Sequence, residues 1–350
     1  MINVRTTGES RKIRSRAPLR IGLAGGGTDL ATYCDRFPGA VLNVTIDRFA
    51  FASSTPRDDG AVLFEADDLV VGEEWRPGEE KSSRLTLHQA VYSRMIAEFG
   101  GGEPVAVTLR TTVDAPPGSG LGSSSALVVA LVDAMRELLD APLGLYDVAR
   151  LAYEIERIDL GLSGGRQDQY AAAFGGMNFI EFLPGDRVIV NPLRANRSVI
   201  CELESSVVIC FSGTSRESAK IITQQQSAMS EAQAPALEAM HQLKRDADEM
   251  KHAFAMGDIE AMAEILQSSW QAKKSTANAI SSPRIEQLLE LGLASGGLAG
   301  KVSGAGGGGF MFFLVHPENR RRLITALNQA GAQAGPVKFT EHGCETWRFR

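Results

Sequence analysis

The segment Pro116-Pro117-Gly118-Ser119-Gly120-Leu121-Gly122-Ser123-Ser124-Ser125-Ala126 joins a β-rich segment at 105–110 to an apolar run that begins at Leu127. The apolar run predicts a helix over 123–139. The first turn of a helix has unpaired N–H groups and a partial positive charge, so it attracts anions. Glycines let the backbone approach a ligand closely, and serine hydroxyls can contact a phosphate or a divalent metal. We therefore predict a phosphate-binding loop that consists of Pro117, Gly118, Ser119, Gly120, Leu121, Gly122, Ser123, Ser124 and Ser125.

Two common phosphate-binding patterns do not match this loop. The Walker A pattern needs a lysine that is missing here, and G-x-G-x-x-G needs a glycine where Ser123 stands. A simpler alternative is a Gly/Ser turn in which a serine caps an ordinary helix. Three glycines and three serines at one helix start favour the phosphate-binding interpretation.

Three further glycine windows mark the chain. Of its 36 glycines, 14 lie in four short windows. Glycine weakens helices and strands, so such windows indicate sharp turns or close approach to a ligand. Besides the loop above, they are Gly25–Gly27, Gly161 with Gly164 and Gly165, and Gly304 with Gly306–Gly309. Four such loops predict a site that is assembled from distant segments.

The first window follows a strand-like segment and has a rival interpretation. Gly22, Ala24 and Gly27 approximate the spacing of a dinucleotide fingerprint, and Asp47 stands near the place of a ribose-binding acid. Alanine at the second glycine argues against it, as does Pro18 at the start of the strand. A second strand-like segment also follows where the fingerprint requires a helical crossover.

Charged residues accompany the windows. Arg20 and Asp29 fit the edge of a pocket, although a surface ion pair is the alternative. Glu156 ends a predicted helix, and a glycine turn leads to Asp168 at the start of the next one, so both carboxylates can face one pocket. Two carboxylates in different environments suit a metal-linked role and a base role. Asp168 can instead be an acid that is favoured by the helix dipole.

The last window, Ser303-Gly304-Ala305-Gly306-Gly307-Gly308, lies between two predicted strands. So many glycines within β structure are unfavourable for folding. Close approach of the backbone to a phosphate or to another loop explains them, and a bare hairpin turn is the alternative.

The composition excludes several classes of function. The 350 residues are 44% hydrophobic, and the formal net charge is −6, which argues against nucleic acid or a membrane surface as the partner. The longest apolar runs are far shorter than the ~18 residues that span a bilayer. The four cysteines have no metal or redox spacing. We predict a cytoplasmic protein.

Strand and helix patterns interleave irregularly over the chain, which predicts an α+β protein. At about 150 residues per domain, the length fits two domains. We place the boundary within 191–198, which gives domains at 1–195 and 196–350. Among the predicted strands are 41–46, 48–54 and 336–340.

Taken together, the motifs resemble those of the GHMP kinases, which include galactokinase and the homoserine, mevalonate and phosphomevalonate kinases. The first motif of that superfamily is represented by Ala17-Pro18-Leu19-Arg20-Ile21 with Ala24-Gly25-Gly26-Gly27-Thr28-Asp29. The second is matched by the loop at 116–126, and the third by the segment at 303–308. The resemblance implies an N-terminal domain like domain 2 of ribosomal protein S5, a ferredoxin-like C-terminal domain, and a site between them.

Within the superfamily, the segment 23–30 followed by 39–43 and Ile46-Asp47 resembles the D-glycero-D-manno-heptose 7-phosphate kinases. These use ATP to phosphorylate the anomeric (C1) hydroxyl and give the 1,7-bisphosphate, for nucleotide-activated heptose and surface polysaccharide. The Gly-Glu-His of the galactokinase first motif is missing here. Fucose kinases carry a related Ala-Gly-Gly element and are the nearest alternative.

The resemblance also implies residue roles. Asp168 would accept the proton of the anomeric hydroxyl, and Arg20 would balance the developing charge. Ser124 or Ser125 together with Glu156 would hold Mg²⁺, which prefers oxygen ligands. The residues expected on the substrate side are Gly26, Gly27, Thr28, Asp29, Arg166, Gly304, Ala305, Gly306 and Gly307.

Three functions remain open at this point: a heptose-phosphate kinase, a kinase for an unphosphorylated sugar such as fucose or galactose, and a non-catalytic sensor of sugar and ATP. ATP and a sugar phosphate are the expected partners, and a homodimer is possible. Asp168, Arg20 and Glu156 together favour an enzyme over a sensor.

Overall fold

The structure of the chain, a computed structural model, describes residues 12–75, 83–213, 218–230 and 234–349. Within these ranges two β-sheets and their helices form a mixed α+β molecule, as the sequence predicts. None of the helices described is long and apolar enough to cross a membrane.

The larger sheet has eight strands among the described residues. Its longest strands, β1 (Lys12–Ala24) and β2 (Gly39–Pro56), pair in antiparallel fashion over most of the length of β1. The other strands are β3 (Val62–Ala66), β4 (Val71–Trp75), β5 (Val107–Val113), β6 (Met177–Leu183), β7 (Arg187–Pro192) and β12 (Glu345–Phe349). The order is β12-β1-β2-β5-β3-β4, with β6 paired to β2 and β7 to β6.

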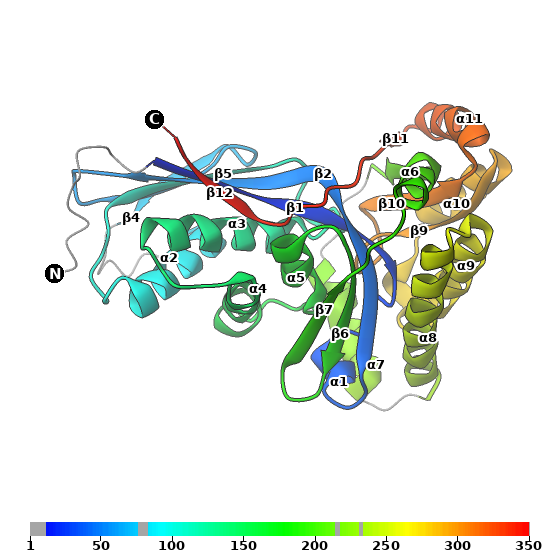
Figure 1. The fold of residues 1–350 in the computed structure, drawn as a ribbon, viewed down its shortest axis with the longest axis horizontal. Coiled ribbons are helices and arrows are strands. Elements are labelled where there is room, and N and C mark those ends of the chain that lie inside the picture. Colours follow the sequence, from blue (N-terminus) through cyan, green and yellow to red (C-terminus); the bar gives the residue numbers. More distant parts are fainter. Residues whose placement is uncertain (1–11, 76–82, 214–217, 231–233, 350) are drawn as a thin grey trace.

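Helices cover one face of this sheet (Figure 1). They are α2 (Thr86–Phe99), α3 (Ser123–Leu138), α4 (Leu145–Tyr153) and α5 (Gln167–Phe174). Helix α3 lies against β1 and β2, and its apolar run from Val128 to Val132 is buried. Burial of an apolar run of this kind is the main stabilising term for a helix on a sheet. The N-terminus of α3 is thereby fixed at the end of β5.

The smaller sheet has the antiparallel order β11-β8-β10-β9. It consists of β8 (Val207–Phe211), β9 (Gly297–Val302), β10 (Phe310–Val315) and β11 (Gln333–Pro336). Every residue of the apolar strand β10 is buried, because its alternate side chains pack into two different hydrophobic clusters, one on each face of the sheet. This arrangement fits the ferredoxin-like domain that the resemblance implies.

Five further α-helices follow β8 in the described part of the chain, and the last four of them lie to the right of the larger sheet in Figure 1. They are α7 (Ser218–Ser230), α8 (Ala234–Met256), α9 (Ile259–Lys274), α10 (Pro283–Ala294) and α11 (Pro317–Gln329). The side chain of Asp258 caps α9, and Ser282 with Pro283 starts α10, in agreement with known helix signals. Helices α8 and α9 pack against each other, and α9 contacts both β1 and β9.

Some elements differ from the sequence predictions. The expected strands 41–46 and 48–54 are one strand, β2, whose residues 46–48 bulge away from β1, and Ile46 and Asp47 pair with the segment at 338–339 instead. The expected strand 336–340 overlaps β11 only at Pro336, where β11 ends. The hairpin β3–β4 and the helices α1 (Ala31–Cys34) and α6 (Arg197–Ser206) were not predicted.

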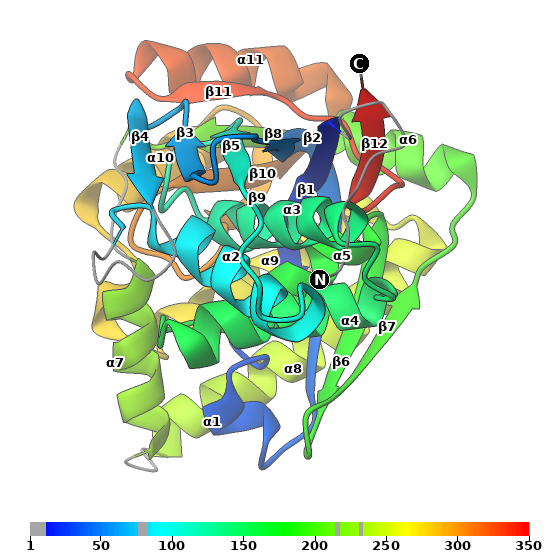
Figure 2. The ribbon, with the colours of Figure 1, turned by 90° about the vertical axis from the view of Figure 1, so that its left-hand side faces the viewer.

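The chain passes twice between the regions of the two sheets. Residues 193–196 link β7 to α6, which is where the sequence places the domain boundary. Near the other end, Thr340 bonds to Thr45, and β12 then pairs with β1. Figure 2 shows β12 beside β1, so the last strand of the chain belongs to the larger sheet and not to the smaller one.

Candidate active site

The loop between β5 and α3 has the geometry of an anion-binding site. Gly118, Gly120 and Gly122 all have φ between +70° and +78°, a region that other residues rarely adopt. The residue at the N-cap of α3 is Gly122, which has no side chain to bond the first N–H groups of the helix. Gly118 and Ser124 are exposed to solvent. The start of the helix is therefore open to a ligand, as the phosphate-binding interpretation requires.

The segment 303–308, which matches the third family motif and is called the third segment below, packs against this loop. A Cβ placed on Gly120 would lie 2.5 Å from the carbonyl oxygen of Ser303, and the Phe310 N–H donates to Ser119 O at 2.7 Å. The segments of the first motif (17–29) and the second motif (116–126) are also linked, because Arg20 N donates to Leu121 O at 3.0 Å. The glycine segments that the sequence predicts to converge do lie together.

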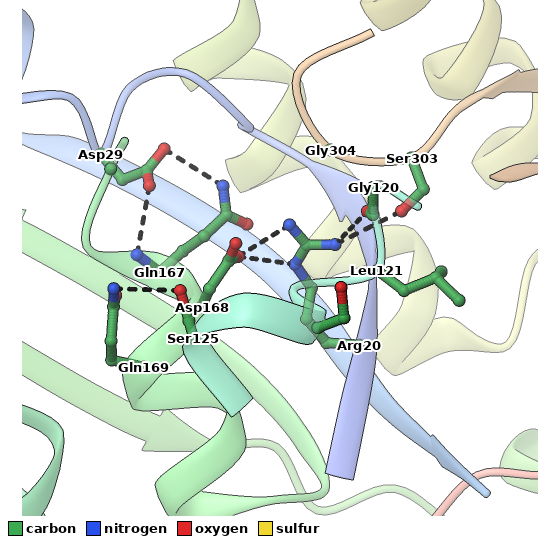
Figure 3. A network of polar contacts seen from close by, with 12 residues as sticks. Arg20, Asp29, Gly120, Leu121, Ser125, Gln167, Asp168, Gln169, Ser303 and Gly304 are labelled. Atoms are coloured by element: carbon green, nitrogen blue, oxygen red, sulfur yellow. Dashed lines mark hydrogen bonds and ion pairs between the residues drawn. The ribbon is translucent and has the colours of Figure 1, made fainter. Parts of the chain in front are cut away.

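Arg20 and Asp168 form an ion pair beside the loop (Figure 3). Nε and Nη2 of Arg20 lie 2.8 Å and 2.7 Å from Asp168 Oδ1, and Nη1 donates to Gly120 O at 2.6 Å. The Arg20 side chain is buried, whereas one fifth of the Asp168 side chain is exposed. A Cβ on Gly122 would lie 3.5 Å from Asp168 Oδ2, so this oxygen faces the start of α3. A cation, a carboxylate and an anion-binding helix start thus share one site.

Glu156 lies in a π-helical turn, Glu154–Asp159, that continues α4. Such turns often occur at functional sites. Its buried carboxylate accepts hydrogen bonds of 2.7 Å from each of Ser124, Ser125 and Gln169. Ser124 is exposed, whereas Ser125 is buried and also accepts a bond from Gln169. The carboxylate and the exposed hydroxyl are oxygen donors of the type that Mg²⁺ prefers, so the donor set fits this ion.

Asp29 and Thr28 are buried in the turn after β1. Asp29 accepts hydrogen bonds from Gly27 N and from the backbone and side chain of Gln167, at 3.0–3.2 Å. Thr28 Oγ1 donates to Gly25 O or Ala40 O, which lie 2.8 and 2.9 Å away. These contacts fix the turn and the start of α5, and with it the position of Asp168.

Known proteins match both parts of this architecture. The model of the GHMP kinases N terminal domain matches residues 86–176, and the model of the GHMP kinases C terminal region matches residues 250–333. A D-glycero-alpha-D-manno-heptose 7-phosphate kinase of Campylobacter jejuni is 42% identical over 341 residues, which cover 97% of this chain and all of that protein.

The chain belongs to the GHMP kinases. It is thus an ATP-dependent phosphotransferase with an alcohol group as acceptor.

Solved structures of GHMP kinases share the whole fold. A crystal structure described as a D-glycero-D-manno-heptose 1-phosphate kinase from Bacteroides thetaiotaomicron is 39% identical, with a TM-score of 0.82, and covers 97% of this chain and 99% of its own. Lactococcus lactis galactokinase, at 18% identity, has a TM-score of 0.75 over 97% of this chain and 95% of its own. The two-domain α+β fold predicted from the motifs is confirmed.

The remaining substrate-side predictions for this GHMP kinase fall into two groups. Gly26, Gly27, Gly304 and Ala305 are half-buried. The others, Gly306, Gly307 and Arg166, are buried. The Gly307 N–H donates to Ile280 O at 2.7 Å.

Arg166 forms ion pairs with two exposed acids. One Arg166 nitrogen, Nη2, lies 2.7 Å from an Asp186 oxygen and 3.2 Å from an Asp35 oxygen. Its guanidinium also lies over the ring of Tyr153. The observed contacts of Arg166 are therefore with neighbouring loops, and a contact with substrate stays a prediction.

Sequence reasoning missed two buried lysines of this GHMP kinase. Lys273 Nζ donates to Gly304 O at 2.6 Å, and Lys301 Nζ donates to Leu23 O at 3.1 Å. Burial lowers the pKa of Lys273 to about 8 and that of Lys301 to about 7. The sequence does indicate that Lys273 is buried, because Lys273 follows Leu266 and Trp270 at the spacing of the buried face of α9.

A cavity of about 210 Å³ adjoins the phosphate loop and was also missed. Leu69, Leu85, Val113 and Leu127 give it an apolar wall, and Pro117 and Ser124 connect it to the loop. His88 also lines it, and burial lowers the pKa of this imidazole to about 4, so the ring is neutral. The unpredicted β3–β4 region supplies part of the wall, so the cavity left no motif in the sequence.

Proposed function

We propose that this chain transfers the γ-phosphoryl group of ATP to the anomeric hydroxyl of D-glycero-D-manno-heptose 7-phosphate. The observation that carries the proposal is the Arg20–Asp168 pair at the open start of α3, in a chain that is 42% identical to a heptose 7-phosphate kinase. The product would be the 1,7-bisphosphate, a precursor for nucleotide-activated heptose and surface polysaccharide. We place the reaction in the cytoplasm, and a homodimer stays possible.

Each half of ATP has a matching part of the site. The glycine loop and the N-terminal N–H groups of α3 suit the phosphates. The adjoining apolar cavity suits the base, because Leu69, Leu85 and Leu127 can pack on its faces. Substrate on the other side of Asp168 would reach the space beside Gly26 and Gly304.

Phosphoryl transfer depends mainly on positioning and charge neutralisation. The bond between the γ-phosphorus and its bridging oxygen breaks, the bond to the sugar oxygen forms, and the hydroxyl proton passes to Asp168 Oδ2. Arg20 holds Oδ1 and thereby keeps Oδ2 directed at the acceptor. Ser124 and Glu156 would hold Mg²⁺, which when bound would neutralise charge on the ATP phosphates.

The substrate assignment is tested with purified protein, Mg²⁺–ATP and a panel of acceptors. The panel contains the heptose 7-phosphate, the heptose 1-phosphate named for the Bacteroides structure, L-fucose and galactose. We expect ADP release with the 7-phosphate and a new anomeric phosphate in the phosphorus NMR spectrum. Faster turnover of the 1-phosphate or of a free sugar would replace our assignment, and no turnover of any acceptor would favour a sensor.

A further inference from the structure

Lys273 is a buried cation between two glycine segments of the site. Only 4% of this residue is exposed, and its Nζ lies 3.6 Å from the position that a Cβ on Gly26 would take. The same Nζ donates to Gly304 O at 2.6 Å. Gly304 in turn packs on Gly120, where an added Cβ would lie 2.7 Å from the Gly120 oxygen. The ammonium of α9 thus reaches the point where the first segment, the third segment and the phosphate loop meet.

The charged side chains around Lys273 do not pair with it directly. Its electrostatic neighbours are Asp29, Arg20 and Asp168, and Lys301 lies behind it. Asp168 is already paired with Arg20, and Asp29 accepts three N–H groups. Among the described residues, no carboxylate lies within ion-pair distance of Lys273. The two carboxylates nearest to Lys273 therefore have other partners, and Asp246 lies on the side of Lys301.

A buried ammonium without a carboxylate partner is unfavourable for folding, so a function has to account for it. An ammonium has three N–H donors, and within the described part of the chain one of them is bonded, to Gly304 O. The other two are free to meet an anionic ligand. The anion expected at this place is the phosphoryl group, because Arg20 contacts both Gly120 O and the carboxylate that faces the acceptor.

We propose that Lys273 is a catalytic residue whose ammonium donates hydrogen bonds to the phosphoryl oxygens during transfer from ATP to the sugar. The inference rests on the proposed kinase reaction. The ammonium keeps its three protons throughout, since the hydroxyl proton goes to Asp168. Lys273 and Arg20 then approach the transferred group from the side opposite the start of α3.

The test compares Lys273→Met with Lys274→Met, a change at the next residue. Lys274 lies over the Trp270 ring and near Glu286, outside the phosphate site, so it controls for loss of a lysine from the end of α9. We expect kcat of Lys273→Met to fall by roughly 10²–10³-fold, as for loss of one donor to a developing anion. The Kd for ADP and the melting temperature should stay close to those of Lys274→Met.

A second readout separates catalysis from a structural role. ADP with aluminium fluoride mimics the phosphoryl group in transfer, and calorimetry measures its binding. We expect wild type and Lys274→Met to bind it more tightly than ADP alone, and Lys273→Met to lose that gain. Should Lys273→Met fail to fold, Lys273→Gln, which keeps an N–H donor without the charge, is measured in the same way.

The outcomes are distinct. A Lys273 variant that folds and keeps the turnover of wild type overturns the inference, as does a variant that retains the gain from aluminium fluoride. A variant that loses ADP binding and thermal stability together indicates a structural brace and also overturns it. If wild type turns over no acceptor, the proposed function fails, and the aluminium fluoride comparison still decides the role of Lys273.

Discussion

Two nitrogens of Arg20 contact the same oxygen of Asp168, Oδ1, and leave Oδ2 facing Gly122. The arginine is in turn held by Gly120 O of the phosphate loop. The loop that we propose for the nucleotide phosphates therefore also holds the arginine that orients the Asp168 carboxylate.

Replacing Asp168 with Asn tests its role as the base. The amide cannot take the hydroxyl proton, so we expect kcat to fall by roughly 10²–10⁴-fold while the KM for ATP changes little. Steady-state kinetics with varied ATP measures both. Asp248→Asn, on the exposed side of α8, should behave as wild type. Near-normal turnover of Asp168→Asn would remove the base assignment.

Glu156→Gln tests the metal site. The amide has the shape of the carboxylate but not its charge, so we expect the Mg²⁺ concentration for half-maximal activity to rise roughly 10–100-fold. Glu154→Gln is the matched control, since Glu154 lies on the same π-helical turn and pairs with Arg94. An unchanged Mg²⁺ dependence of Glu156→Gln would show that the ion is held elsewhere.

Gly120→Ala tests the contact between the phosphate loop and the third segment. The new Cβ would meet Ser303 O at 2.5 Å in addition to the strain of a positive φ. Gly185 has a nearly equal φ, and the space around its Cβ position is open. Gly185→Ala therefore measures the loss of stability from backbone strain alone, about 1 kcal/mol. We expect Gly120→Ala to lose about 1–3 kcal/mol more in urea unfolding, and to bind ATP more weakly. Equal losses for both variants would contradict a close packing of the two segments.

Thr86→Trp tests the cavity as the site of the base. Thr86 is exposed at the start of α2 and lines the cavity, so an indole there should fill it and raise the KM for ATP with little change in kcat. Thr112→Trp is the control, because Thr112 is exposed on β5 between the two cavity-lining residues of that strand. If both variants keep the wild-type KM, the base binds at another place.

Lys301→Met tests the cost of a second buried ammonium. Lys301 faces Leu23 O, the Phe312 ring, Lys273, Asp246 and Arg20, and burial lowers its pKa to about 7 from an ordinary 10.5. Below about pH 7 both folded and unfolded wild type carry the proton. Above it the unfolded chain binds more protons, so wild-type stability rises with pH relative to Lys301→Met.

We expect the difference in the free energy of unfolding between wild type and Lys301→Met to change by about 1 kcal/mol per pH unit from about pH 7 to pH 10. Urea unfolding of both proteins across this window measures it, and Lys244→Met on α8 is the control. A difference that does not change with pH would mean that Lys301 keeps its ordinary pKa in the folded protein.

The parts of the site that could be predicted are those in which the local sequence determines the backbone conformation. Glycines at 118, 120 and 122 require unusual φ values whatever surrounds them, so the loop was predictable, and so was its place before α3. The many glycines at 304–309 predicted close approach to a phosphate or to another loop, and Gly120 does lie against Ser303. The partner of Asp29 was not predicted, because Gln167 reaches it only when α5 packs beside β1.

The parts that were missed depend on packing between distant elements. Lys273 follows an ordinary amphipathic pattern, and its proximity to Gly26 arises only from the contact of α9 with β1. The cavity forms where β3, α2 and β5 pack around Leu127, so no single segment of the sequence contains a motif for it. Long-range assembly, not local propensity, decided both features.

The pairing of β12 with β1 has a consequence for engineering. A fragment that stops before α6 would leave the backbone of Lys12–Arg16 as a bare sheet edge, which invites pairing with foreign chains. The complementary fragment would carry the missing strand at its far end. Two such halves, produced together, should recognise each other through this strand, which makes the linker before α6 a natural place to build a split enzyme whose activity reports on reassembly.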